Sequence, residues 1–161
     1  MRYEKMTYRV DLKSFMARCE ANYHRLCQIF PNMAVEERRC LGLTGSDNRE
    51  VVLSVTERTP YTTLLRVEEH GKPGSCPNSG ASWSKPPILT VRMYHDAKLA
   101  EVVDCDGMRG VRPKNPYPNK NMLQRDEKAQ WNCFLEEWLA VCMEHAYVSE
   151  PASLSFSGDV D

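Results

Sequence analysis

Hydrophobic residues recur every three or four positions in two long stretches of this chain, one in each half. Such spacing is typical of a helix that packs one face against a core. In the first stretch Asp11 is suited to cap the helix N-terminus, and Pro31 ends the helix after about 18 residues. The apolar positions of this predicted helix are Phe15, Met16, Cys19, Tyr23, Leu26, Cys27 and Phe30.

A second, longer helix is predicted from about residue 122 to residue 145. Its apolar stripe consists of Trp131, Phe134, Leu135, Trp138 and Cys142. Counting back along the stripe by four and seven residues reaches Glu127 and Gln124. The first turns of this helix are therefore polar where a buried face would otherwise continue.

Between the two helices, apolar and polar residues alternate, which is typical of half-buried β-strands. Turn-forming residues separate the runs, so that neighbouring runs are expected to pair as antiparallel hairpins. The predicted strands are residues 36–43, 49–56, 61–69, 88–95, 98–103 and 108–111.

The tight turn at Asp96-Ala97 sets the register of one of these hairpins. The register predicts that Arg92 lies opposite Glu101, which places two opposite charges on one face of the sheet. The other predicted pairs are Met93 with Ala100 and Tyr94 with Leu99. The residues predicted to face the core are Val91, Met93, Ala100 and Val102.

These elements predict an α+β fold, with an antiparallel sheet of about five strands packed with an N-terminal helix and a longer C-terminal helix. The 161 residues suit one domain with its own core. Residues 1–147 are predicted to form this globular domain, with a flexible internal loop at 71–87 that is rich in Gly, Pro and Ser. Residues 148–161 are predicted to be a disordered acidic tail.

Composition narrows the classes of function. A net charge of -1 with 27% charged residues gives no general attraction to nucleic acid or to anionic membranes, so neither partner is expected. No apolar run is long enough to cross a bilayer, and the N-terminus lacks the apolar segment of a secretory signal. Seven cysteines without a CxxC pair predict reduced thiols. A cytoplasmic protein without a cofactor is expected.

A basic segment lies next to the polar start of the second helix. Residues 109–128 contain six Arg and Lys residues against two acidic ones. One interpretation is structural: Gln124 and Glu127 close the core as a polar network, with Arg92 or Arg125 as the charge partner. The other is functional: this end of the helix recognises a phosphate, a nucleotide or an acidic protein surface. Both interpretations remain open from the sequence.

Two weaker patterns concern metal or acid–base chemistry. His95 and Asp96 lie at the hairpin turn, and several acidic residues follow, but no metal-binding or phosphate-binding motif accompanies them. The pairs His24 with Cys27 and Cys142 with His145 have the spacing of zinc ligands on two helices. Nothing in the sequence brings the two pairs together.

Several blocks of the sequence are similar to one family. They are Tyr61-Thr62-Thr63, the segment from Thr90 to Ala97, Ala100-Glu101-Val102, the segment from Tyr117 to Gln130, Phe134-Leu135 and Trp138-Leu139. In these blocks the chain resembles the YqiB-like family of bacterial proteins, a domain of unknown function, over about residues 8–145. The resemblance implies a bacterial cytoplasmic protein and brings no activity, ligand or catalytic residue with it.

The sequence thus favours a cytoplasmic binding module with a regulatory or adaptor role and a protein partner. The predicted recognition surface consists of Arg92, Tyr94, His95, Asp96, Tyr117, Asn119, Lys120, Gln124, Arg125, Glu127 and Lys128. The alternative is a small-molecule sensor or an enzyme that acts on a phosphorylated or nucleotide ligand. That alternative requires His95, Asp96 and the turn at 124–127 to converge in one pocket.

Overall fold

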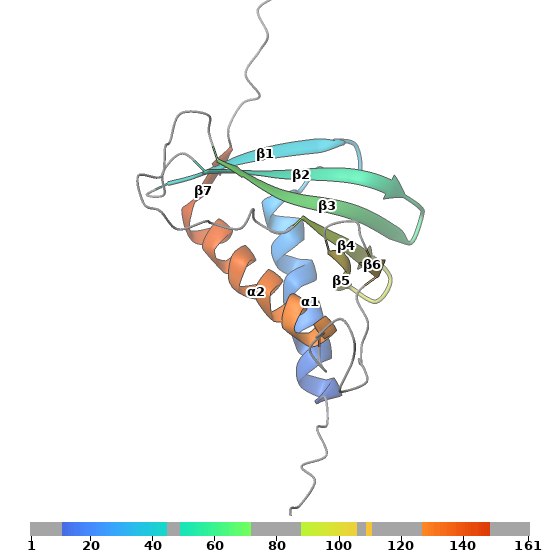
Figure 1. Cartoon of the computed structure of the whole chain (residues 1–161). Helices are drawn as coiled ribbons and strands as arrows, with labels where there is room; N and C mark the ends of the chain where they lie inside the picture. The colour runs from blue at the N-terminus through green and yellow to red at the C-terminus, as the bar shows by residue number, and fades with distance from the viewer. Residues whose placement is uncertain (1–10, 45–48, 72–87, 106–108, 111–126, 149–161) are drawn as a thin grey trace, which may run out of the picture.

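The computed structural model describes residues 11–44, 49–71, 88–105, 109–110 and 127–148. Within these residues the fold is α+β, as predicted, with two helices and a seven-stranded sheet (Figure 1). The elements are α1 (Leu12–Ile29), β1 (Arg38–Leu43), β2 (Arg49–Arg58), β3 (Thr62–Gly71), β4 (Leu89–Tyr94), β5 (Leu99–Cys105), β6 (Arg109–Gly110), α2 (Glu127–His145) and β7 (Ala146–Val148).

The described strands form one antiparallel sheet in the order β6-β5-β4-β3-β2-β1-β7. The first six strands follow one another as a meander, and β7 then returns to the far edge, where it pairs with β1. Both helices lie on the same side of the curved sheet, and α1 packs against α2 and β5 (Figure 1). The strand count exceeds the predicted five, in part because β7 gives no signal in the sequence.

Helix α1 begins and ends where the sequence predicts. The carboxylate of Asp11 accepts hydrogen bonds from the backbone N–H groups of Lys13 and Ser14, at 3.1 and 3.4 Å. At the other end, the Phe30 N–H donates to the Leu26 carbonyl at 2.9 Å, and Pro31 follows. The predicted stripe is correct at its centre, but Met16 is exposed and Asn22, which lies outside the stripe, is fully buried.

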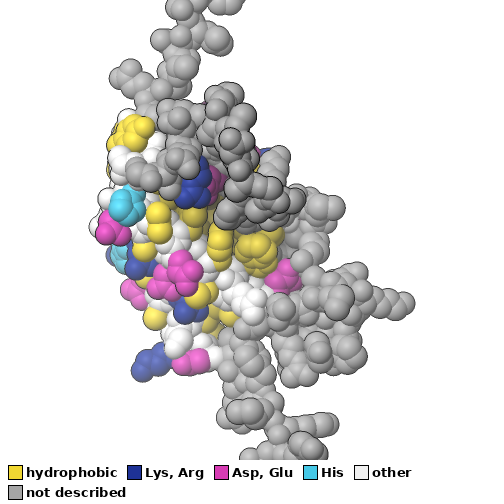
Figure 2. Space-filling view, turned by 60° about the vertical axis from the view of Figure 1, so that its left-hand side comes forward, with side chains coloured by type: hydrophobic (Ala, Val, Ile, Leu, Met, Phe, Trp, Pro, Cys, Tyr) yellow, Lys and Arg dark blue, Asp and Glu magenta, His cyan; other side chains and the backbone are white. Residues whose placement is uncertain are grey.

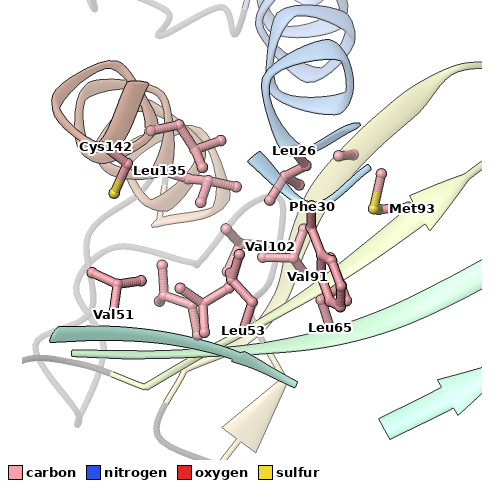
Figure 3. Packing of buried hydrophobic residues seen from close by; sticks show 14 of the residues in the cluster. Leu26, Phe30, Val51, Leu53, Leu65, Val91, Met93, Val102, Leu135 and Cys142 are labelled. Atoms are coloured by element: carbon pink, nitrogen blue, oxygen red, sulfur yellow. The ribbon is translucent and has the colours of Figure 1, made fainter. Parts of the chain in front are cut away.

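The core fills the space between the two helices and the sheet (Figure 3). Side chains from both helices and the sheet point toward one another there; among them are Leu26, Phe30, Val51, Leu53, Leu65, Leu135 and Cys142. The residues predicted to line the core from β4 and β5 are all fully buried: Val91, Met93, Ala100 and Val102. The register of this hairpin is also confirmed, including Arg92 opposite Glu101.

Helix α2 faces the core with most of the predicted stripe, since Leu135 and Cys142 are buried and Trp131 and Trp138 pack against the core. Its buried residues are Glu127, Asn132, Leu135, Leu139 and Cys142. The prediction of Phe134 as a core residue is wrong, because its side chain is exposed. The helix is rotated so that Asn132 points inward. A stripe chosen from apolar residues alone does not include an asparagine. The predicted first residues of this helix, 122–126, lie outside the described residues.

Strand β7 continues directly from α2. Val148, which the sequence assigns to the tail, pairs with Leu41 of β1, and Tyr147 pairs with Gly42. A side chain at Gly42 would overlap the ring of Tyr147, so glycine is what allows the ring to lie over β1 at this point. The remainder of the predicted tail and residues 72–87 of the predicted loop lie outside the described residues.

Candidate functional site

The start of α2 meets the β4–β5 hairpin at Glu101. The ammonium group of Lys128 lies 2.8 Å from Glu101 Oε2, and only 18% and 19% of the two side chains is exposed. The hydroxyl of Tyr94 donates to the other oxygen, Glu101 Oε1, at 2.9 Å. The Glu101 carboxylate therefore links side chains from β4 and α2 to β5.

Arg92 completes this group, which we call the Glu101 network: Arg92, Tyr94, Glu101 and Lys128. Burial and the hydrogen bond to Glu101 raise the pKa of Tyr94, whereas a hydrogen bond from Arg92 acts in the opposite direction. The Tyr94 hydroxyl thus contacts a carboxylate and a guanidinium group together. Arg92 itself is exposed, so it presents this polar group to solvent.

Asn132 holds α2 in the position that brings Lys128 to Glu101. Its Oδ1 accepts a hydrogen bond from the Val102 N–H at 3.1 Å, and its Nδ2 donates to the Lys128 carbonyl at 2.8 Å. From α1, Asn22 Nδ2 donates to the Asn132 carbonyl at 3.3 Å. Two buried asparagines therefore join α1, α2 and β5 directly beneath the network. Neither asparagine was predicted to be buried, because a single polar residue on a helix is normally expected to face the solvent.

Cys19 of α1 lies in the electrostatic field of the same network. Burial, together with the nearby Glu101 carboxylate, raises the pKa of its thiol to about 11, although the positive charges of Lys128 and Arg18 partly oppose this rise. A thiol with so high a pKa stays protonated at neutral pH and is a poor nucleophile. Cys19 therefore contributes packing to the site.

His95 lies just after the end of β4 and contacts different elements from the rest of the predicted surface. Its Nδ1 is 3.1 Å from the Tyr23 hydroxyl of α1, and its Nε2 is 2.7 Å from the Thr63 hydroxyl of β3. Its backbone N–H donates to the Tyr61 carbonyl at 2.8 Å. Since Thr63 is buried, the imidazole serves as a link between α1 and β3. Asp96, the next residue, is exposed at the turn.

The structure describes part of the predicted recognition surface. It brings Arg92, Tyr94 and Lys128 together through Glu101, a residue not included in that surface. Glu127 is buried at the start of α2, which agrees with its predicted position on the inward stripe. The remaining predicted residues, Tyr117, Asn119, Lys120, Gln124 and Arg125, lie outside the described residues.

The predicted charge pair between Arg92 and Glu101 takes an indirect form. The two residues face each other across the strands, as the register predicts, but the Glu101 oxygens are bonded to Lys128 and Tyr94. Arg92 instead interacts with the Tyr94 hydroxyl, whose pKa it lowers. The position of α2, which the sequence does not specify, decides which cation pairs with Glu101.

The metal hypotheses gain no support from the part of the chain that is described. Within it, no group of three or more His, Cys, Asp or Glu side chains is arranged to hold a metal ion. The thiol of Cys142, which belongs to one of the two pairs with zinc-ligand spacing, is buried, and burial raises its pKa to about 12. Among the described cysteines, those at 19, 27, 40, 105, 133 and 142 are free thiols, and Cys76 lies outside the described residues.

Neither described helix is both long enough and apolar enough to span a membrane.

Comparison with known proteins agrees with the family resemblance that the sequence blocks indicate. A family described as "Protein of unknown function (DUF1249)" matches residues 25–148. The chain is 36% identical over 145 residues to "Uncharacterized protein YqiB" of Escherichia coli strain K12, which covers 89% of this chain and 96% of the relative. Proteins of the same name from E. coli O6:H1 and O157:H7 match equally well. No solved structure matches.

The chain therefore belongs to the YqiB-like family, DUF1249. The matched region includes every described strand and the whole of described α2, so the Glu101 network lies within it.

Proposed function

We propose that this protein is a cytoplasmic, non-enzymatic binding module that recognises a protein partner through the β4–β5 hairpin and the start of α2. The observation that carries the proposal is the Glu101 network. Side chains from three elements converge there, and the network is anchored beneath by Asn132 and fixed by a largely buried ion pair. Preorganised polar groups of this kind lose little side-chain freedom when a partner binds.

Exposed apolar side chains on the same helix support a protein partner over a small ligand. Phe134, Val141 and Met143 of α2 are all more than one-third exposed. In Figure 2, which brings the α2 side of the molecule forward, hydrophobic side chains are interspersed with charged ones. Protein interfaces combine apolar contacts with polar groups in this way.

The chemistry of the described His95 and cysteine side chains favours binding over catalysis. Both ring nitrogens of His95 are within hydrogen-bond distance of hydroxyl groups from its own fold, which leaves neither free to move a substrate proton. Burial raises the pKa of the thiols of Cys19, Cys27 and Cys142. Thiols of this kind lack the thiolate character that nucleophilic catalysis requires.

The alternative proposal is a sensor or enzyme for a phosphorylated or nucleotide ligand. The exposed guanidinium group of Arg92 is the described group best suited to a phosphate. Against this alternative, His95 bonds to α1 and β3, whereas the start of α2 meets the hairpin at Glu101. The alternative requires His95 to lie in one pocket with the turn at 124–127. Among the described residues, no contact supports this arrangement.

The test compares three tagged proteins in affinity purification, with quantitative mass spectrometry, from the cells that naturally produce the chain. They are the wild type, the site variant Arg92→Ala/Asp96→Ala, and the control variant Glu37→Ala/Arg38→Ala. All four replaced side chains are exposed, and each variant removes one positive and one negative charge. Arg38 lies on β1, three strands from β4 and thus about 14 Å away at the usual strand spacing.

The proposal predicts a protein that the wild type and the control retain and that the site variant loses, with thermal unfolding unchanged in both variants. A site variant that retains every protein bound by the wild type would overturn this surface as the binding site. If no protein depends on the site, while nucleotides or phosphorylated metabolites raise the unfolding temperature of the wild type alone, the alternative proposal replaces it.

A further inference from the structure

Strand β7 lies at the edge of the sheet and covers only part of β1 (Figure 1). It pairs with Leu41–Leu43 of β1, whereas β2 pairs with Arg38–Gly42 on the other side. Among the described residues, the segment Arg38–Cys40 therefore has a partner strand on one side only. We call this segment the β1 edge segment. Unpaired backbone groups at the edge of a sheet are a template for a further strand.

The backbone of Cys40 points toward the open side of this segment. The carbonyl of Glu37 accepts a hydrogen bond from the Val55 N–H at 2.7 Å, which is a bond toward β2. The Thr44 N–H donates to the His145 carbonyl at 2.9 Å, which is a bond toward the chain of β7. Alternate residues of an antiparallel strand bond to opposite neighbours, and the register of β1 with β2 is regular. Cys40 therefore directs both its N–H and its carbonyl away from β2, beyond the described end of β7.

Arg39, in the same edge segment, has a donor without an acceptor. Its Nε atom is buried and has no hydrogen-bond partner among the described residues. Its Nη1 atom lies 3.7 Å from Glu36 Oε2, which is an ion pair but is too long for a hydrogen bond. A buried charged donor that lacks an acceptor is costly to the folded state. An acidic side chain beside β1 at this position would remove that cost.

The register of β7 indicates which residues would reach this position. Leu41 pairs with Val148, so continuing the same register places Ser149 opposite Cys40 and Glu150 opposite Arg39. Residues that are directly opposite lie on the same face of the sheet, where a pair of opposite charges is stabilising. The next residue is Pro151, which has no N–H to give to the ladder, so the pairing would end there.

The chain's own segment has two advantages over a strand from another molecule. Ser149 follows directly from Val148, which is already paired with β1, so its effective concentration at the edge segment is far higher than that of a separate chain. The charge of Glu150 also complements that of Arg39, which stands at the matching register position.

We infer that the β1 edge segment is a strand-docking site for the chain's own Ser149–Glu150. The Cys40 N–H donates to the Ser149 carbonyl, the Ser149 N–H donates to the Cys40 carbonyl, and the Glu150 carboxylate accepts from the Arg39 guanidinium group. While this contact holds, no strand from another molecule can add to the same part of β1. The site is separated from β5, which carries Glu101, by the other strands of the sheet, so it does not depend on the proposed function.

The experiment measures hydrogen exchange of individual backbone amides by two-dimensional NMR in the full-length protein. The variant Ser149→Pro removes the N–H of the proposed pair, and its matched control, Ser153→Pro, places the same residue beyond Pro151. A second pair of variants tests the charge contact. Glu150→Gln removes the proposed partner of the guanidinium group, and Glu20→Gln removes the same charge from an exposed position on α1.

The Cys40 amide should exchange at least about tenfold more slowly in the wild type and in Ser153→Pro than in Ser149→Pro, because only the last protein lacks the paired strand. The amide of Val91, which is fully buried on β4, should exchange equally in all proteins and so report an intact fold. Equal exchange of Cys40 in the wild type and in Ser149→Pro overturns the inference.

The arginine Nε–Hε signals of the same proteins test the side-chain contact. The Arg39 signal should shift in Glu150→Gln and stay unchanged in Glu20→Gln. An Arg39 signal that is the same in Glu150→Gln and in the wild type overturns the assignment of Glu150 as its partner.

A second copy of the chain is the other occupant that the edge segment could take. Exchange of Cys40 that is slow at every protein concentration, in a protein that sediments as a monomer, supports the intramolecular contact. Protection that appears only as the concentration rises, together with a dimer in sedimentation, overturns it in favour of edge-to-edge pairing between molecules.

Discussion

The side-chain oxygen of Asn132 accepts a hydrogen bond from the backbone N–H of Val102. A residue of α2 thus supplies the acceptor that a neighbouring strand would otherwise provide to β5. Both residues are fully buried, and water has no access to the Val102 N–H. A buried N–H without an acceptor is costly to the folded state. The contact therefore specifies both the height and the rotation of α2 against the sheet.

Replacing Asn132 with alanine should lower the free energy of unfolding by about 1–3 kcal/mol, because the Val102 N–H loses its buried acceptor. Asn22→Ala should cost less, since the Oδ1 atom of Asn22 is buried without a hydrogen-bond partner and its removal also removes that penalty. Urea unfolding of the two variants measures the difference. Equal losses would show that the Asn132–Val102 bond has no special importance.

The ion pair of Lys128 and Glu101 should show measurable coupling. A double-mutant cycle with Lys128→Met and Glu101→Gln should give a coupling energy of about 1–2 kcal/mol, because both side chains are largely buried and weakly screened. The control cycle uses Arg66 and Glu68 of β3, where the arginine is nearly half exposed; it should give less than about 1 kcal/mol. A coupling energy no greater than that of the control would contradict the role of this pair in fixing the start of α2.

Stability should fall at alkaline pH. Burial raises the pKa of Cys19 from 9.0 to about 11 and that of Cys142 from 9.0 to about 12. Above pH 9 the unfolded chain has released these protons while the folded chain still holds them, so the stabilising effect of the protonated thiols is lost as pH rises. The free energy of unfolding should decrease by about 1.4 kcal/mol per pH unit for each thiol between pH 9 and 11.

Urea unfolding at several pH values from 7 to 11 checks this slope. In the variant Cys19→Ala/Cys142→Ala the decline should be shallower, although Tyr23 and Tyr94, whose pKa values are also raised by burial, still contribute above pH 10. An unchanged slope in the double variant would show that the two thiols are not responsible.

The contact of Gly42 with Tyr147 should be non-additive. Gly42→Ala forces the Tyr147 ring away from β1, and we expect a loss of about 1–2 kcal/mol in the free energy of unfolding. In a Tyr147→Ala background the same substitution should cost much less, because the overlapping ring is absent. Thermal or urea unfolding of the four proteins measures the coupling. Additive effects would mean that Tyr147 does not rest on Gly42 in solution.

The sequence was sufficient for those elements whose signals are local. Asp11 and Pro31 mark the two ends of α1, and both ends are as predicted. In the β4–β5 hairpin, alternation and a tight turn determine which residues face inward, and the pairing of Arg92 with Glu101 follows from them. Each of these features depends on residues that are close together in the chain.

The features that could not be predicted depend on contacts between distant segments. Strand β7 has only three residues, and Tyr147 and Val148 are both exposed, so it carries no alternation; it is a strand because β1 offers an open edge. Asn132 faces inward because its partner is a backbone group of β5, 30 residues away. The partners of Glu101 likewise depend on where α2 docks, which explains why this central residue was absent from the predicted recognition surface.

Residues 127–148 complete the sheet at two places that are far apart in the strand order. Asn132 accepts a hydrogen bond from the backbone of β5, and β7 pairs with the edge of β1. This segment follows α1 and the six-stranded meander in the chain, so during translation those elements are made while both of these positions are still open. Open strand edges favour pairing between chains. A chain truncated before residue 127 would therefore expose both edges and aggregate rather than form a smaller folded protein.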